Sequence, residues 1–339
     1  MAKKTKAVVL GVGAERGLGA AASRRFAKEG YHVLVAGRTG PKIDKVVQGI
    51  REAGGSATAV AVDGTKEDEV VALFDKAMAD DADGAPADLL VFNMGNNAAV
   101  DFREMTAQHF EDSWRVGCFA GFLFGREAMR RLAPLGRGTV IFTGASGSLR
   151  GRPRFAAFNA TKGGLRLLVQ SMAREFGPQG IHVAHAIIDG GIEGERLLSR
   201  MPDRVEKAGP DGLLNIDAIA DSYWHLHRRP LGTRVTKIHL FDAPLFEKLQ
   251  MGRQRDAGHD QMQIPQHPCV QRRQRIRQII RLLLIIPLQT DNVPGLNHPR
   301  QQLGRFFRRK HLSIGQMGHP RDTLLLVTAS KIPRGVVDH

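Results

Sequence analysis

The sequence predicts an α/β fold with a doubly wound parallel sheet between two layers of helices. Two observations lead to this prediction. Over residues 1–245, short apolar runs alternate with longer segments whose apolar residues recur at helical spacing. A glycine-rich turn, GVGAERGLG at 11–19, separates the first apolar run from the first helical segment. Alternation of this kind predicts βαβ units, in which ligands bind at the carboxyl ends of the strands.

Each predicted strand is a short run rich in Val, Ile and Ala, and each predicted helix is a longer amphipathic segment. The strands are expected near 6–12, 31–37, 57–63, 88–93, 138–143, 181–188 and 235–241. The helices are expected near 17–30, 41–53, 67–80, 107–132, 155–176 and 214–227.

The composition changes beyond the last predicted strand, which places a domain boundary between 1–245 and 246–339. Residues 251–339 contain 15 Lys and Arg against 5 Asp and no Glu, so they hold +10 of the formal net charge of +15. A segment so basic and so poor in aromatic residues buries little apolar surface. It is expected to be a poorly ordered extension, with local helix at most around 271–286.

Cysteine content and hydropathy limit the class of protein. Two cysteines, Cys118 and Cys269, provide neither a disulfide framework nor the spacing of metal ligands, which favours the cytoplasm and predicts no metal site. The apolar stretch 279–288 is interrupted by Arg281 and is about half as long as a membrane span requires. No membrane association is therefore expected.

The glycine-rich turn predicts a dinucleotide site of the Rossmann type. Gly13, Gly17 and Gly19 permit a tight turn and a close approach of the backbone to a pyrophosphate at the start of the helix, at Leu18. The second strand ends at Gly37 and is followed by Arg38 instead of an acidic residue, and Arg16 precedes Gly17. Because guanidinium groups pair well with phosphate oxygens, Arg16 and Arg38 favour NADP(H) over NAD(H).

Further motifs follow in order along the chain. Asp63 follows the third strand, FNMG with Asn93 and Gly95 follows the fourth, and FNATK at 158–162 begins a long helical segment. With the spacing Gly-x-x-x-Gly-x-Gly, these motifs resemble those of the short-chain dehydrogenase/reductase family over residues 6–245. The resemblance implies that Asp63 contacts the adenine, that Asn93 and Gly95 line the cofactor site, and that Lys162 grips the nicotinamide ribose.

The resemblance also shows where catalytic groups are missing. Phe158 stands at the position of the family's proton-donating tyrosine, four residues before Lys162. Ala145 stands at the position of the substrate-binding serine, with Ser146 one residue on, and Gly117 replaces the family's asparagine. Ser146 can serve only if the chain turns there, because side chains alternate along a strand. The other two tyrosines, Tyr31 and Tyr223, do not restore the motif.

The segment after the sixth strand departs from the family as well. Asp189 and Gly190 stand where the family has Pro-Gly beside the nicotinamide, and Gly194 stands where a threonine often occurs. Groups that could act in place of the missing ones are Ser146 and Ser148, His185 and Asp189, and the arginines Arg150, Arg152 and Arg154. Each has a plainer interpretation as a capping serine, a core histidine, a turn aspartate or a solvated arginine.

Two main hypotheses remain open on the sequence. The first is an NADP(H)-dependent oxidoreductase acting on a small carbonyl or alcohol, with water held by Ser146 or Lys162 as proton source. The alternative is a catalytically inactive NADP(H)-binding sensor or scaffold. The apolar helices at 107–132 and 155–176 predict a homodimer or homotetramer. A nucleic-acid arm around RFFRRKH at 305–311 is the least favoured interpretation of the extension, and translation beyond the natural end of the gene is preferred.

Overall fold

The computed structural model describes residues 3–209, 212–241, 312–317 and 324–329, and the statements below concern these residues. Seven parallel strands form one sheet in the order β3-β2-β1-β4-β5-β6-β7. This order confirms the predicted doubly wound sheet, whose direction of winding reverses between β1 and β4. The strands are β1 (Thr5–Leu10), β2 (His32–Gly37), β3 (Ser56–Ala61), β4 (Ala85–Phe92), β5 (Gly138–Thr143), β6 (Ile181–Asp189) and β7 (Lys237–Phe241).

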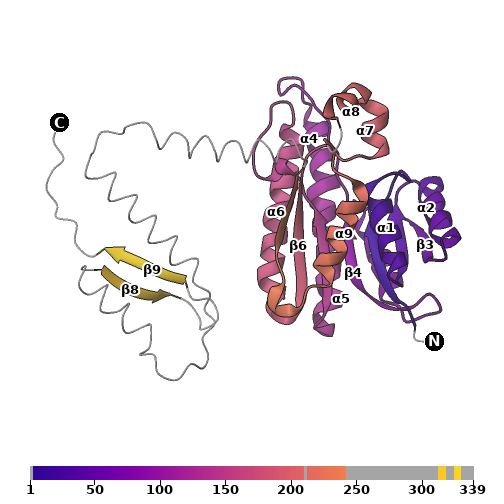
Figure 1. Cartoon of the computed structure of the whole chain (residues 1–339), viewed down its shortest axis with the longest axis horizontal. Helices are drawn as coiled ribbons and strands as arrows, with labels where there is room; N and C mark the ends of the chain where they lie inside the picture. Colours follow the sequence, from indigo (N-terminus) through magenta and orange to yellow (C-terminus); the bar gives the residue numbers. More distant parts are fainter. Residues whose placement is uncertain (1–2, 210–211, 242–311, 318–323, 330–339) are drawn as a thin grey trace. The chain divides into compact units, whose positions relative to one another are not determined.

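Helices cover both faces of the sheet (Figure 1). Helices α1 (Leu18–Lys28), α2 (Gly40–Glu52) and α9 (Ile216–His227) pack on one face. Helices α3 (Glu67–Met78), α5 (Ala120–Leu132) and α6 (Ala156–Phe176) pack on the other, preceded by α4 (Ala107–Trp114). Two short helices, α7 (Glu195–Arg200) and α8 (Pro202–Ala208), lie together at the end of the sheet remote from the N-terminus.

Three features of this domain differ in detail from the sequence prediction. Strand β1 ends at Leu10 because Gly11 has a φ of +96°, a conformation that glycine adopts most readily. The expected helix at 107–132 is divided by a π-helical turn, Arg115–Phe119, between α4 and α5. Helices α7 and α8 are not predicted, since at six and seven residues they are too short for a clear apolar period.

Strands β1, β2, β5 and β6 are buried on both faces, whereas the edge strands β3 and β7 are partly exposed. The alternation of side chains along β6 separates the two halves of the core. Ala184, Ala186 and Ile188 join the cluster under α1, α2 and α9. Ile181 and Val183 join the cluster under α3, α5 and α6. His185 follows this second alternation, so its ring lies on the α6 face of the sheet.

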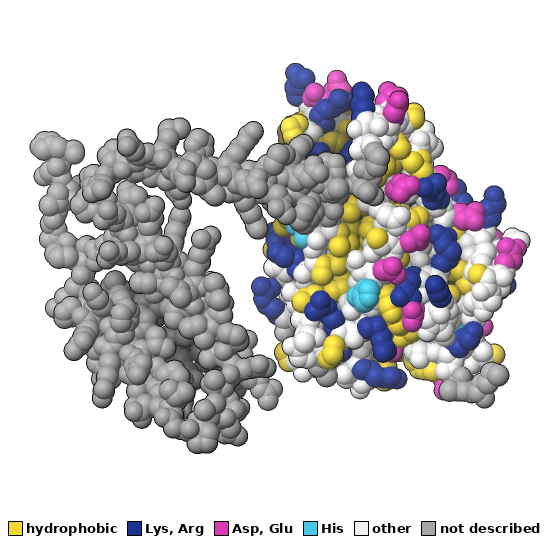
Figure 2. Space-filling model, viewed as in Figure 1, with side chains coloured by type: hydrophobic (Ala, Val, Ile, Leu, Met, Phe, Trp, Pro, Cys, Tyr) yellow, Lys and Arg dark blue, Asp and Glu magenta, His cyan; other side chains and the backbone are white. Residues whose placement is uncertain are grey.

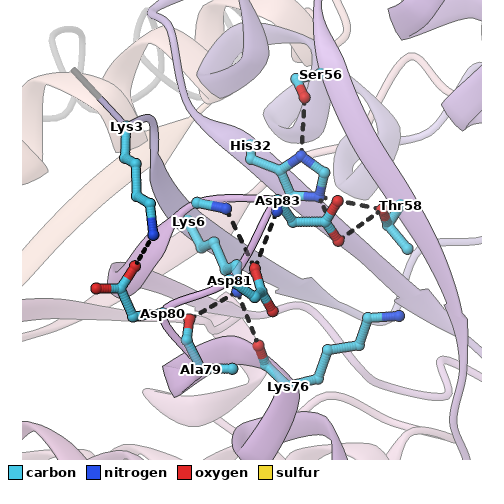
Figure 3. Close-up of polar contacts among 11 residues, drawn as sticks. Lys3, Lys6, His32, Ser56, Thr58, Lys76, Ala79, Asp80, Asp81 and Asp83 are labelled. Atoms are coloured by element: carbon cyan, nitrogen blue, oxygen red, sulfur yellow. Dashed lines mark hydrogen bonds and ion pairs between the residues drawn. The ribbon is translucent and has the colours of Figure 1, made fainter. Parts of the chain in front are cut away.

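A polar cluster anchors the loop between α3 and β4 at the amino ends of the strands (Figure 3). Lys6 of β1 is fully buried, and its Nζ donates to the carbonyl of Ala79 at 2.8 Å and pairs with Asp81 at 2.7 Å. His32 of β2 hydrogen-bonds Ser56 and Thr58 on the neighbouring strand. This end of the sheet is therefore closed by structural contacts, and a ligand site is expected at the opposite end.

The contacts of the chain divide it into two units, Met1–His259 and Asp260–His339. The boundary expected at residue 245 stays a prediction. Within the second unit the structure adds a feature that the sequence analysis does not predict, an antiparallel pair of strands, β8 (Leu312–Met317) and β9 (Leu324–Ala329). The expected helix around 271–286 lies outside the described residues.

Candidate functional site

The glycine-rich turn joins β1 to α1 at the carboxyl edge of the sheet. A side chain at Gly13 would meet nothing within 4 Å, so the backbone there faces open space. Gly17 caps α1 without a side chain, and a Cβ on Gly19 would lie 3.1 Å from the Asn93 amide nitrogen. This turn therefore fits the cradle of a pyrophosphate, with Gly13 leaving the space and Gly17 opening the helix N-terminus.

The two arginines expected at a 2′-phosphate lie in different surroundings. Arg16 pairs with Glu193 at 2.5 Å, and its carbonyl accepts from the Glu195 amide at 2.7 Å. Arg38 is exposed at the end of β2 and lies close enough to Asp63 to lower the pKa of that carboxyl. Arg38 thus remains available to a ligand, while Arg16 holds the segment before α7.

The residues after β3 and β4 complete the edge of the nucleotide site. Burial raises the pKa of Asp63, but hydrogen bonds from the amide and hydroxyl of Thr65 outweigh it and lower the pKa overall. Asn93 ties β4 to β1: its backbone N–H donates to the Leu10 carbonyl at 2.8 Å, and its side-chain Nδ2 donates to the Gly11 carbonyl at 3.3 Å. Asp63 is therefore an ionised acceptor beside Arg38, and Asn93 holds the turn in shape.

Lys162 occupies the centre of the site, one turn into α6. Its side chain is buried, and its Nζ donates to the carbonyl oxygens of Met94 at 3.0 Å and Thr143 at 2.8 Å. A Cβ on Gly95 would lie only 3.1 Å from this nitrogen, so glycine is the residue that fits there. Burial lowers the pKa of Lys162 to about 8. The site therefore holds an ammonium group that titrates close to neutral pH.

Phe158 lies one helical turn before Lys162 and packs beside the turn after β5. A Cβ on Gly147 would come within 3.2 Å of the Phe158 ring. Strand β5 ends at Thr143, and a 3-10 turn, Ser146–Ser148, follows extended Ala145. The chain therefore does turn at Ser146, which was the condition for that serine to act.

The Ser146 hydroxyl is nevertheless directed to a different partner. It hydrogen-bonds the carboxylate of Asp189 at the end of β6. Asp189 is buried and also accepts from Arg150 at 2.9 and 3.0 Å and from His239 at 3.1 Å. Burial raises the pKa of Asp189, but these hydrogen bonds and the charge of Arg150 lower it overall. His239, from β7, was not anticipated, because nothing in the sequence pairs it with Asp189.

Gly117 lies in the π-helical turn at the position of the family's asparagine. A Cβ at Gly117 would overlap the methyl group of Thr161 on α6. Cys118, the next residue, is half-buried, and its pKa is raised by burial. The thiol is thus not an activated nucleophile, and the Thr161 methyl group fills the space beside Gly117.

His185 lies beneath α6 on the same side of the sheet as Lys162. It is 1% exposed, and neither of its ring nitrogens has a hydrogen-bond partner among the described residues. Its ring packs against Gly144, where a Cβ would overlap it. Burial, reinforced by the charge of Lys162, lowers the pKa of His185 to about 3. The imidazole is therefore neutral at physiological pH.

The remaining candidates contact residues other than Lys162. Tyr31 hydrogen-bonds Asp88 and His227, and buried Tyr223 hydrogen-bonds the Thr143 hydroxyl at 2.8 Å. Arg152 stacks over Phe155, and the Ser148 hydroxyl is buried without a partner in the described part of the chain. Arg154 has a φ of +67°. Its backbone carbonyl accepts a hydrogen bond from the Val100 amide at 2.8 Å. Neither tyrosine therefore replaces the hydroxyl missing at Phe158.

A cavity of about 550 Å³ opens beside this site. Its lining residues come from the segments after β2, β3 and β4, from α4, from the π-helical turn and from α7, and they include four arginines: Arg38, Thr65, Gly95, Asn96, Asp112, Arg115, Val116, Arg196 and Arg200. Only Arg38 and Gly95 among them were predicted as site residues. Arg196 and Arg200 lie on α7, which is too short to have a clear sequence pattern.

Comparison with known proteins identifies the class. Residues 7–200 match the model of the short chain dehydrogenase family, and the chain belongs to this family. A crystal structure of a short-chain dehydrogenase from Rhodopseudomonas palustris is 36% identical and superposes with a TM-score of 0.58, covering 69% of this chain and 97% of that one.

Two relatives of known activity illustrate the range of the family. Gluconate 5-dehydrogenase from Gluconobacter oxydans is 29% identical over 171 residues, which span 50% of this chain and 66% of that enzyme. The 3beta-hydroxysteroid dehydrogenase 1 of Eggerthella lenta is 30% identical over 220 residues, or 62% of this chain and 80% of that enzyme. The relatives are oxidoreductases that act on chemically different alcohols.

The described residues contain neither a membrane-spanning helix nor a cluster of metal ligands. No helix in this part of the chain is long and apolar enough to span a bilayer. Nor does it contain a group of three or more His, Cys, Asp or Glu side chains arranged to hold a metal ion.

Proposed function

We propose that this protein is an NADP(H)-dependent oxidoreductase that interconverts a small carbonyl compound and its alcohol. The main support is Lys162, a buried ammonium group held by two backbone carbonyls beside the open face of the glycine-rich turn. Burying a lysine is costly, and here burial lowers its pKa to about 8. Such a cost is typical of a functional site.

The cofactor fits the residues present. Gly13, Gly17 and the N-terminus of α1 would hold the pyrophosphate, Asp63 would accept from the adenine, and Arg38 would bind the 2′-phosphate. Asn93 and Gly95 would line the ribose, and Asp189 and Gly190 would border the nicotinamide. When bound, the nicotinamide supplies or accepts a hydride. Lys162 would donate its third N–H to the ribose hydroxyls.

Reduction of a carbonyl also needs a proton at the oxygen. Phe158 has none to give, and the Ser146 hydroxyl is hydrogen-bonded to Asp189. We therefore assign the proton to the third N–H of Lys162, which would pass it on through the ribose hydroxyl or one water and recover it from solvent. An ammonium with a pKa of about 8 is a suitable acid near neutral pH. Loss of a dedicated donor typically costs about 10²–10⁴-fold in rate, which leaves slow turnover.

An inactive sensor or scaffold is the second candidate. It is favoured by the filled space at Gly117, since the Thr161 methyl group occupies the place of the asparagine side chain. In this case the cofactor would bind and raise the melting temperature without turnover.

Binding and turnover distinguish the two functions. NADPH and NADH would be titrated by fluorescence and thermal shift, and a panel of aldehydes, ketones and alcohols would be assayed with wild type, Phe158→Tyr and the double variant Phe158→Tyr with Ala145→Ser. Tight NADPH binding with wild-type turnover supports the enzyme. Cofactor binding by the wild type, with turnover only in the variants, supports the inactive sensor or scaffold. If the wild type binds neither nucleotide, both functions are wrong.

We further propose that the protein forms a homodimer or homotetramer through α4, α5 and α6. Large apolar side chains are exposed on these helices: Phe110, Trp114, Phe122 and Leu167 at 42%, 41%, 41% and 59%. Sedimentation of wild type and of Leu167→Glu tests this, since a charge at the centre of an apolar interface disrupts it. A monomeric wild type would contradict the proposal.

The one free cysteine among the described residues, Cys118, fits a cytoplasmic setting.

A further inference from the structure

The cavity of about 550 Å³ beside Lys162 has an unusual charge. Four guanidinium groups line it, from Arg38 after β2, Arg115 in the π-helical turn, and Arg196 and Arg200 on α7. Asp112 is the one acidic residue of its lining, and its carboxylate accepts from Gln108 at 2.9 Å. The lining therefore has an excess of three positive charges. Figure 2 shows both Lys or Arg and Asp or Glu side chains at the end of the domain formed by α7 and α8, so the excess of positive charge is a property of the cavity lining.

No ion pair within the described residues neutralises these four arginines. The Arg115 guanidinium lies over the Phe119 ring at 5.1 Å, and Arg196 reaches the Asn96 amide oxygen at 3.5 Å. Glu193, just before α7, pairs with Arg16 and not with either arginine of α7. The charge of Arg38 helps to lower the pKa of Asp63, but the two side chains form no ion pair in the described residues, and Asp63 Oδ1 accepts from the amide and hydroxyl of Thr65.

The two arginines of α7 also repel each other. They are four residues apart, which places them on one face of the helix. Burial, and then the positive charge of Arg200, lower the pKa of Arg196. Two guanidinium groups that face one cavity without a carboxylate between them create a potential that an anion relieves.

We propose that Arg115, Arg196 and Arg200 join Arg38 in one phosphate clamp, so that α7 closes over the 2′-phosphate of the bound cofactor. The inference rests on the proposed NADP(H) function and extends it. Arg38, Thr65 and Gly95 place the cavity at the adenosine half of the nucleotide site, where the 2′-phosphate is the nearest dianion.

The clamp makes α7 a determinant of cofactor choice. Each charge-assisted hydrogen bond to phosphate oxygens adds to affinity, and NADH has no phosphate at this position. Arg196→Ala and Arg200→Ala should therefore each raise the Kd for NADPH by about tenfold and leave the Kd for NADH within about twofold. Replacement of both by Lys should retain part of the affinity, because the charge remains without the fork geometry.

The experiment titrates NADPH, NADH and adenosine 2′,5′-bisphosphate against wild type, Arg38→Ala, the α7 double variant Arg196→Ala with Arg200→Ala, and Arg174→Ala as an exposed control on α6. The expected result is loss of NADPH and bisphosphate affinity in the double variant, with no change in the control. Because the two arginines have no carboxylate partner in the described residues, the melting temperature without ligand should be unchanged or higher.

The outcomes separate this inference from the proposed function. If the wild type does not bind NADPH, the proposed function is wrong. If the wild type binds NADPH and the double variant binds it equally well, the clamp is wrong and the function stands. If only the KM of an anionic substrate rises while both nucleotide affinities hold, the arginines serve the substrate and the phosphate clamp is overturned.

Discussion

The Nζ of Lys162 donates a hydrogen bond of 2.8 Å to the carbonyl of Thr143, the last residue of β5. A second bond of 3.0 Å to Met94 fixes the same nitrogen to the loop after β4. These two strands are neighbours in the sheet, so the ammonium group bridges their carboxyl ends. The position of the charge thus depends on the backbone and does not require a tyrosine beside it.

Replacement of Lys162 by Met should change how stability depends on pH. The pKa of Lys162 is about 8 in the folded chain, whereas a lysine side chain ordinarily has a pKa of 10.5. Between pH 8 and 10.5 the unfolded chain therefore binds more protons, and the free energy of unfolding rises with pH by at most about 1.4 kcal/mol per unit. Urea unfolding across this range should show the rise in wild type and in exposed Lys207→Met, but not in Lys162→Met. Equal slopes in all three would contradict the buried charge.

Substitution of Gly117 should depend on Thr161. A Cβ at Gly117 overlaps the Thr161 methyl group, so Gly117→Ala should cost about 1–3 kcal/mol of stability through overpacking. Thr161→Ser removes that methyl group and should restore most of the loss in the double variant. The coupling energy from the four proteins of this cycle, measured by denaturant unfolding, tests the contact. Additive effects would show that the methyl group is not the obstacle.

Removal of the Asp189 charge should disturb the edge of the site. Asp189→Asn weakens the hydrogen bonds from Ser146, Arg150 and His239 and should lower stability by about 1–3 kcal/mol. The pKa of Asp189 is lower in the folded chain than in the unfolded chain. Its contribution to the free energy of unfolding is therefore complete above the unfolded-state pKa and is lost as the pH falls through the folded-state pKa. The difference between wild type and variant should therefore shrink below about pH 4.

An exposed pair provides the control for Asp189. Asp101 pairs with Arg103 at 3.0 Å, and the arginine side chain is 86% exposed. Asp101→Asn should therefore change stability much less than Asp189→Asn does. A loss in Asp101→Asn as large as that in Asp189→Asn would mean that burial adds nothing to the Asp189 network.

The sheet was predictable from the sequence because its signals are local. Each strand is a short apolar run with clear ends, and the turn at Gly13 and Gly17 has its own spacing. The register of FNATK predicts Lys162 at the cofactor, and this role stays a prediction; the structure shows its Nζ bonded to the carbonyls of Met94 and Thr143. The π-helical turn was not predictable, since Arg115–Phe119 differs from the helices around it by one backbone hydrogen bond and not by an apolar pattern.

The contacts of the site were harder to predict because they join distant segments. Arg16 was expected at a phosphate and pairs with Glu193, which is 177 residues away. Ser146 was expected at the substrate oxygen and bonds Asp189. Arg196 and Arg200 were not predicted to line the cavity, because the sequence of a six-residue helix does not show which of its faces lies toward a cavity. Side-chain partners of this kind follow from tertiary packing and not from spacing.

The pH dependence of stability should also reveal His185. Its pKa is about 3 in the folded chain, whereas a histidine side chain ordinarily has a pKa of 6.5, because the buried ring resists protonation. The unfolded chain therefore binds more protons between these values, and stability is lost by at most about 1.4 kcal/mol per unit as pH falls from 6.5 towards 3. His185→Leu should remove this part of the slope, whereas the same change at exposed His225 should not. At pH 7, His185→Leu should be neutral or stabilising, because it deletes two ring nitrogens that lack partners among the described residues. A destabilisation at pH 7, or an unchanged acid slope, would mean that the ring is hydrogen-bonded in solution.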